Sequence, residues 1–289
     1  MTFDAFIETA WNDHADRPQE VADRLAASLP LVTSPAHIAP FARLVTHVFG
    51  EHLGQWQRGI ALLESLRGRP AFDGGADATR TVSRNVAALR YADGDGSALP
   101  ALPLEDQVVA LATAASAFAG RGEFKGALAA YAEALRRMDG GVPAGSPAFR
   151  ALAIGGNNLA AALEEKPDRD AELTRGMVAA AEDGLKYWKI AGTWLEEERA
   201  EYRLARSLLQ AGRPGDAGTS AQRCVAVCQG NAAPPFELFF GYAVLAQTQR
   251  AAGDSDRFAA ARAQALQMFE QVPGEERRWC AVDLGALDA

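Results

Sequence analysis

Arginine side chains recur at helical intervals in the second half of the sequence. Arg199 and Arg203 are four residues apart, and Arg206 follows three residues later. In an α-helix, side chains three or four residues apart lie on the same face. A planar guanidinium group donates paired hydrogen bonds to a carboxylate or a phosphate. This row predicts a surface that binds an anionic group, although the chain carries a net charge of −8.

The elements that must position this row are predicted to be repeated helical hairpins. Four alanines recur in the same small-residue context, at spacings of 45, 45 and 41 positions: Ala115, Ala160, Ala205 and Ala246. Two of these alanines have another small residue twelve positions later, Ala127 and Ala217. Antiparallel helices that pack closely need small side chains where they cross. Each alanine therefore indicates the first helix of a hairpin.

A glycine stands seven positions after three of these alanines, at Gly122, Gly212 and Gly253. A helix commonly ends at a glycine with a left-handed backbone, which lets the chain reverse. One hairpin cannot bury its large apolar residues alone, so successive hairpins must stack. Alternating β-branched runs are nearly absent, which predicts an all-α fold of about twelve helices without a sheet.

These residues resemble the tetratricopeptide repeat (TPR) family. The match is good for residues 106–139 and 197–229, and fair for 151–187 and 238–270. The spacing exceeds the family's usual ~34 residues, which implies longer helices or loops, as in the kinesin light chain variant. The resemblance implies one α-α superhelix, or solenoid. Residues 1–99 would form degenerate hairpins, and residues 100–289 would form TPR-like repeats ending in a C-terminal capping helix.

In such a superhelix the first helices line a concave groove. The residues expected to face this groove are Asn157, Asn158, Arg199, Tyr202, Arg203, Arg206, Gln247 and Arg250. Chaperone-binding members of the family hold a carboxylate in a five-residue clamp. Asn158, Arg199 and Arg203 match three of its positions, whereas Ala112 and Ser116 occupy the other two. The resemblance therefore implies a groove for an acidic peptide or a chain terminus.

The same arginines have a second interpretation. They can pair with neighbouring acidic residues on a solvated helix face, where ion pairs contribute little to stability. The candidate partners are Glu164, Glu197, Glu198 and Glu201. The sequence leaves both interpretations open.

The sequence predicts no metal ion and no cofactor. His47 and His52 are five residues apart, and two imidazoles share a face of an α-helix at a spacing of four. We therefore expect surface or packing histidines. Cys224 and Cys228 lie on one helix face without a second cysteine pair, which favours buried structural thiols. The loop after Asp93 lacks the glycine and glutamate of a calcium loop. Its Gly, Asp and Pro content predicts an irregular, exposed connection over residues 93–104.

Composition narrows the classes of function. The acidic net charge opposes general attraction to nucleic acid or to an anionic membrane surface. No basic and apolar leader or long apolar stretch is present, so we expect a cytoplasmic protein. The leading hypothesis is a non-catalytic scaffold that binds a protein or peptide partner, with oligomerisation left open. The alternative is a sensory or regulatory array that binds a small anion or self-associates. No motif supports an enzyme.

Overall fold

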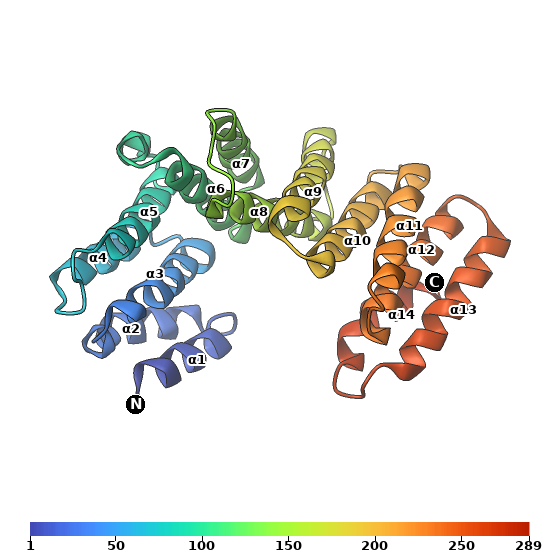
Figure 1. Cartoon of the computed structure of the whole chain (residues 1–289), viewed down its shortest axis with the longest axis horizontal. Coiled ribbons are helices and arrows are strands. Elements are labelled where there is room, and N and C mark those ends of the chain that lie inside the picture. Colours follow the sequence, from blue (N-terminus) through green and yellow to red (C-terminus); the bar gives the residue numbers. More distant parts are fainter. Residues whose placement is uncertain (289) are drawn as a thin grey trace. The chain divides into compact units, whose positions relative to one another are not determined.

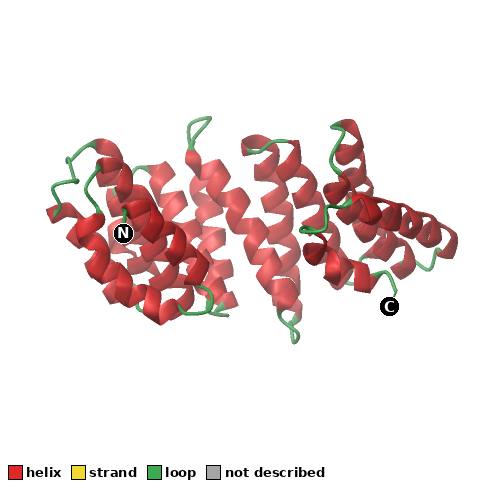
Figure 2. Cartoon of the chain, turned by 90° about the horizontal axis from the view of Figure 1, so that it is seen from below, coloured by secondary structure: helices red, strands yellow, loops and turns green. Residues whose placement is uncertain are grey.

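The computed structural model describes residues 1–288, and within them the chain is all-α. It contains fourteen α-helices and short 3₁₀ or π turns, without a strand in that range (Figures 1 and 2). The predicted fold class is therefore confirmed, with two more helices than expected. The chain divides into two compact units, Met1–Gly155 and a second that begins at Gly156. None of the described helices is long and apolar enough to cross a bilayer.

The first unit consists of short helices followed by longer ones. Its helices are α1 (Phe3–Asp13), α2 (Pro18–Ser28), α3 (Ile38–Thr46), α4 (Trp56–Ser65), α5 (Ala76–Ala92), α6 (Leu104–Gly120) and α7 (Phe124–Met138). Helix α8 (Pro147–Glu165) begins in this unit. The 3₁₀ turns η1 (Leu29–Leu31), η2 (Pro35–His37), η4 (Leu66–Gly68) and η5 (Gly96–Ala101) connect them. The expected division between residues 99 and 100 concerns the regularity of the repeats and stays a prediction.

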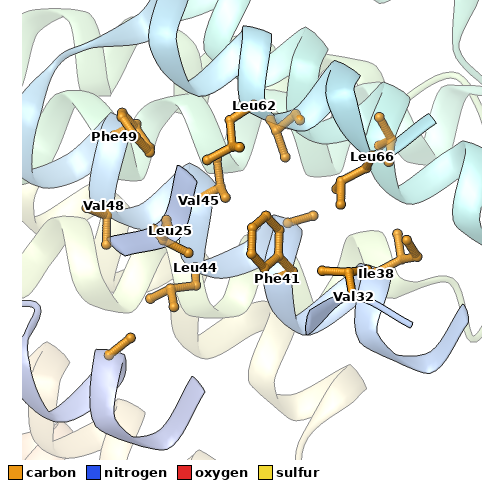
Figure 3. Packing of buried hydrophobic residues seen from close by; sticks show 14 of the residues in the cluster. Leu25, Val32, Ile38, Phe41, Leu44, Val45, Val48, Phe49, Leu62 and Leu66 are labelled. Atoms are coloured by element: carbon orange, nitrogen blue, oxygen red, sulfur yellow. The ribbon is translucent and has the colours of Figure 1, made fainter. Parts of the chain in front are cut away.

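The apolar pattern of residues 1–92 produces a continuous core. Phe41 and Val45 of α3 lie in it beside Leu25 of α2 and Leu66 (Figure 3). All four side chains are fully buried. Burial of side chains of this size stabilises a fold by about 1.5–3 kcal/mol each. The weak repeats at the N-terminus therefore have a genuine core of their own.

A π-helix, η3 (His47–Leu53), separates α3 from α4. The apolar spacing of this segment is helical, and the chain forms a π-helix here in place of an α-helix. The π turn keeps Val48 and Phe49 in the core (Figure 3) and ends at Gly54, whose φ of +59° is left-handed. A Cβ atom on Gly59 would lie 2.9 Å from the Cβ atom of Phe49. Glycine therefore lets α4 approach η3 closely.

The regular hairpins follow the predicted register. In the first unit, α6 packs against α7, and Ala115 and Ala127 are buried between them. Gly122 ends α6 with a φ of +73°. The connection before α6 contains the 3₁₀ turn η5 instead of an α-helix, and most of its residues are exposed. The prediction of an irregular, exposed segment over residues 93–104 is confirmed.

The second unit repeats this hairpin arrangement. It contains the end of α8, then α9 (Ala171–Ala191), α10 (Trp194–Gln210), α11 (Pro214–Gly230), α12 (Pro235–Ala251) and α13 (Ser255–Gln271). The pairs α10–α11 and α12–α13 pack along their lengths. Ala205 and Ala217 are both fully buried, as the spacing predicted. Gly212 and Gly253 have φ values of +72° and +77°.

The described chain ends with η6 (Arg277–Cys280) and the short helix α14 (Ala281–Ala286), which packs on α12. Cys280 and Leu287 join the apolar core of α12 and α13 and are almost completely buried. Whether α14 acts as the expected C-terminal capping helix stays a prediction. The arrangement also places a carboxylate, Asp283, against the side chains of α10 and α12.

Candidate functional site

The predicted arginine row lies on α10. A capping box starts this helix: the Thr193 hydroxyl accepts a hydrogen bond from a first-turn backbone N–H, and Glu196 accepts one from the Thr193 N–H at 2.8 Å. Leu204 and Ala205 face the core, which fixes the rotation of the helix. The arginines lie on the remaining surface of α10. Each of them contacts a carboxylate that belongs to another helix.

The first of these carboxylates is Glu164, at the end of α8. Arg203 Nη1 donates to it at 2.5 Å, and the Ser207 hydroxyl donates at 2.7 Å. Arg206 Nε lies 3.5 Å from the same carboxylate. The side chain of Glu164 is only 2% exposed. A buried carboxylate needs such partners because an unpaired charge in an apolar interior is costly.

The second carboxylate is Asp283, in the first turn of α14. The Tyr202 hydroxyl donates to its two oxygens at 2.9 and 3.0 Å, and Gln247 Nε2 donates at 3.3 Å. Arg206 Nη1 lies 3.7 Å from Asp283 and donates to the Tyr202 hydroxyl at 2.9 Å. Burial, and then the negative charge of Asp283, raise the pKa of Tyr202 above its ordinary value. Three side chains of the predicted groove thus hold one carboxylate of the same chain.

The third carboxylate is Glu237, in the first turn of α12. Arg199 donates to it from Nε, at 3.3 Å, and from Nη2. Behind Glu237 lies Glu198, whose Oε2 accepts hydrogen bonds from Cys224 Sγ at 3.4 Å and from Cys228 Sγ at 3.6 Å. Burial, and then a hydrogen bond with Glu237, raise the pKa of Glu198 to about 10. Glu198 therefore holds a proton at neutral pH.

The other predicted groove residues lie apart from these contacts. Asn157 is half-buried and Asn158 is exposed on α8. Arg250 lies over the ring of Phe258, with 5.4 Å between the guanidinium carbon and the ring centroid. The structure thus brings Tyr202, Arg206 and Gln247 together. Whether the eight residues form a binding site stays a prediction.

The alternative interpretation named four acidic partners. Arg203 and Arg206 contact Glu164, and Arg199 lies 3.7 Å from Glu198, as that interpretation expected. Glu197 and Glu201 instead lie near Lys189, at 3.6 and 3.1 Å. The arginines therefore do pair internally. However, their carboxylate partners are buried, so this face differs from an ordinary solvated one.

Sequence reasoning missed Asp283 and Glu237 as partners of the row. Both follow the row by more than thirty residues and stand in the first turns of their own helices. Acidic residues are common there because they complement the helix dipole. Their positions gave no signal that they would face α10.

A surface pocket of about 370 Å³ also lies in the second unit. Its lining residues are Gln222, Tyr242, Leu245, Gln249, Arg257, Ala260, Ala261 and Gln264. It shares no residue with the predicted groove set. Its lining combines apolar side chains with three glutamine amides, Tyr242 and Arg257.

One geometric expectation about the histidines was wrong. The Nε2 atoms of His47 and His52 lie 3.1 Å apart. The expectation that a spacing of five places them on different faces assumed an α-helix, whereas η3 is a π-helix whose repeat brings residues five apart onto one face. His14 also adjoins them, with 4.9 Å between its ring centroid and that of His47.

No protein-family model matches the sequence, and a search of curated proteins finds no match either. One similar solved structure is the apo form of the quorum sensor NprR from B. thuringiensis. It is 13% identical to this chain, with a TM-score of 0.41 over 98% of this chain and 86% of that one.

Proposed function

We propose that this chain is a non-catalytic, TPR-like helical-repeat protein that binds an acidic peptide segment on the α10–α12 surface. One observation carries the proposal. Tyr202, Arg206 and Gln247 surround the Asp283 carboxylate, which a short helix presents to them. The surface thus has the chemistry to hold a carboxylate on a helical peptide. In this proposal α14 is an intramolecular ligand that a partner peptide replaces.

The electrostatics of the second unit support an acidic partner. Three arginines lie in one row on α10, and their exposed fractions range from 23% to 56% of the side chain. Solvent therefore reaches their guanidinium groups even though their carboxylate partners are buried. A peptide carboxylate that displaced Asp283 would keep the same donors. We place this function in the cytoplasm, as the sequence suggests, and we leave oligomerisation open.

The proposal is tested with the full chain and with a released variant, Asp283→Asn combined with Leu287→Asp. The second change places a charge in the core contact that holds the end of α14. An array of acidic peptides and their amide counterparts is probed at low and high salt. We expect the released variant to bind acidic peptides more tightly than the natural chain, and to lose them as salt screens the charges. If the released variant bound the amide peptides as tightly as the acidic peptides, the proposal would be contradicted.

The same two proteins distinguish peptide binding from the alternative function, which is sensing of a small anion. If the array is a sensor of a small anion, a dicarboxylic acid should raise the melting temperature while no peptide binds. If it is a peptide-binding module, small acids should bind too weakly to shift that temperature. Substitution of Arg206 by Ala should abolish either response, because Arg206 contacts both Glu164 and Asp283.

A further inference from the structure

Three of the four histidines of the chain converge in the first unit. His14 stands at the end of α1, and His47 and His52 lie on η3. One ring nitrogen from each lies within 4.8 Å of the other two. The ring centroids are 4.8–5.1 Å apart. The three side chains are half-buried, so solvent reaches them while the helices hold them.

Two contacts set the orientation of the His14 and His47 rings. His14 Nδ1 is hydrogen-bonded to the backbone carbonyl of Trp11, and His47 Nδ1 lies 3.0 Å from Glu51 Oε1. A ring nitrogen that donates to such an oxygen carries the proton, which leaves the lone pair on Nε2. Metal-binding histidines are typically held in this way by a carbonyl or a carboxylate.

The separation between two of the ring nitrogens is close to the spacing around a bound metal ion. His47 Nε2 and His52 Nε2 are 3.1 Å apart. Two nitrogens bound to tetrahedral Zn²⁺ at about 2.0–2.1 Å from the metal lie about 3.3–3.4 Å from each other. A small rotation of the rings would bring this pair to that spacing, and the His14 ring nitrogen, which lies within 4.8 Å of both, would have to move closer. A simple hydrogen bond between His47 and His52 would explain this one distance, but it would not explain the third imidazole.

The surroundings of His52 also favour neutral imidazoles in this cluster. Burial, and then the charges of His47 and His14, lower the pKa of His52 below its ordinary value of 6.5. Glu51 acts in the opposite direction on the same group. Three positively charged imidazoles at this spacing would repel one another, whereas neutral imidazoles are ligands for zinc, copper and nickel.

We propose that His14, His47 and His52 bind one Zn²⁺ ion through their ring nitrogens, with Glu51 and the Trp11 carbonyl as supports of the His47 and His14 rings. Three histidine ligands leave the fourth position of a tetrahedral site to water or a small anion. The ion would join the end of α1 to η3 and thereby stabilise the N-terminal hairpins. This site is independent of the peptide surface proposed above.

The direct test is equilibrium dialysis of the full chain against Zn²⁺, followed by metal analysis. We expect one ion per chain, lost on His47→Gln or His52→Gln. Glu51→Gln should weaken binding by about 10- to 100-fold, as removal of such supports does elsewhere. His37→Gln is the matched control: it removes the fourth histidine, which is also half-buried but stacks on Phe3 at 4.0 Å. Equal binding by His47→Gln and the natural chain would overturn the proposal.

A second measurement does not depend on whether the variants fold. Nitrogen-15 NMR of the natural chain reports the state of each imidazole, and Zn²⁺ should shift the ring signals of three histidines while His37 stays unchanged. Co²⁺ provides a further check, because the buried Glu198, Cys224 and Cys228 also lie within 4.8 Å of one another. Thiolate-to-cobalt absorption that disappears in Cys224→Ser would place the metal there and overturn the histidine site.

Discussion

The Nε2 atoms of His47 and His52 lie 3.1 Å apart although five residues separate the two histidines in sequence. In an α-helix, residues five apart point in different directions, and a spacing of three or four is needed for side chains to meet. The π turn of η3 adds one residue to the turn and brings the two imidazoles together. Such turns are frequent at functional sites in helical proteins.

A zinc ion bound at this point should make stability depend on both metal and pH. At about pH 7.5 we expect Zn²⁺ to raise the melting temperature, because a ligand that binds only the folded state stabilises it. This increase in melting temperature should become smaller as pH falls through about 6.5 and below, since protonated imidazoles do not bind metal. Differential scanning fluorimetry measures this. An increment of equal size in His47→Gln would contradict the prediction.

The helical register predicts that larger side chains at the crossing points are harmful. Ala205→Leu should lower the free energy of unfolding by about 1–3 kcal/mol, because Ala205 is fully buried against Ala221 and Val244. Ala259→Leu is the control, since Ala259 is exposed on α13 of the same unit. Urea unfolding of both variants provides the comparison. Equal stability of the two would show that the crossing point lies elsewhere.

Much of the fold was predictable because small residues and left-handed glycines have few structural alternatives. Ala115 with Ala127, and Ala205 with Ala217, indicated the hairpins, and all four are buried as expected. The π turn was not predictable, because Leu44 to Leu53 carry an apolar pattern that also suits an α-helix. The close approach of Gly59 to Phe49 joins different elements, and such a contact leaves no local pattern in the sequence.

The contact between Arg203 and Glu164 is expected to stabilise the second unit. Arg203→Ala should lower the free energy of unfolding by about 1–3 kcal/mol, because it removes a donor from a carboxylate that is 2% exposed. Arg213→Ala is the matched control: its partner Asp216 is 60% exposed, and exposed pairs contribute at most about 1 kcal/mol. Chemical unfolding compares the two. A larger loss in Arg213→Ala would contradict this account of the row.

The candidate site was predictable only in part. Helical spacing predicts that the three arginines of α10 share one face, and the structure shows which side chain each of them contacts. Their carboxylate partners come from α8, α12 and α14, and contacts between distant helices leave no local pattern in the sequence. Asp283 in particular stands 81 residues after Tyr202, to which it is hydrogen-bonded.

The buried Glu198 predicts a loss of stability at alkaline pH. Its pKa is raised from 4.5 to about 10 in the folded chain, so between these values the folded state holds a proton that the unfolded state has released. The free energy of unfolding must therefore fall as pH rises through this range. Glu198→Gln cannot release a proton, and it should gain stability relative to the natural chain between about pH 6 and pH 9. A difference that stays constant with pH would contradict the prediction.

The central claim is that the α10–α12 surface holds a peptide carboxylate that Asp283 mimics. The most direct measurement is fluorescence anisotropy of a labelled peptide with the sequence of residues 277–288, carrying Ser in place of Cys280. It is titrated with the natural chain and with the released variant, Asp283→Asn with Leu287→Asp. The natural chain holds Asp283 at high effective concentration, so it should bind the free peptide at least about tenfold more weakly. If the natural chain and the released variant bound the peptide equally, the claim would be contradicted. It would also be contradicted if a peptide with Asn at position 283 bound as tightly as the peptide with Asp.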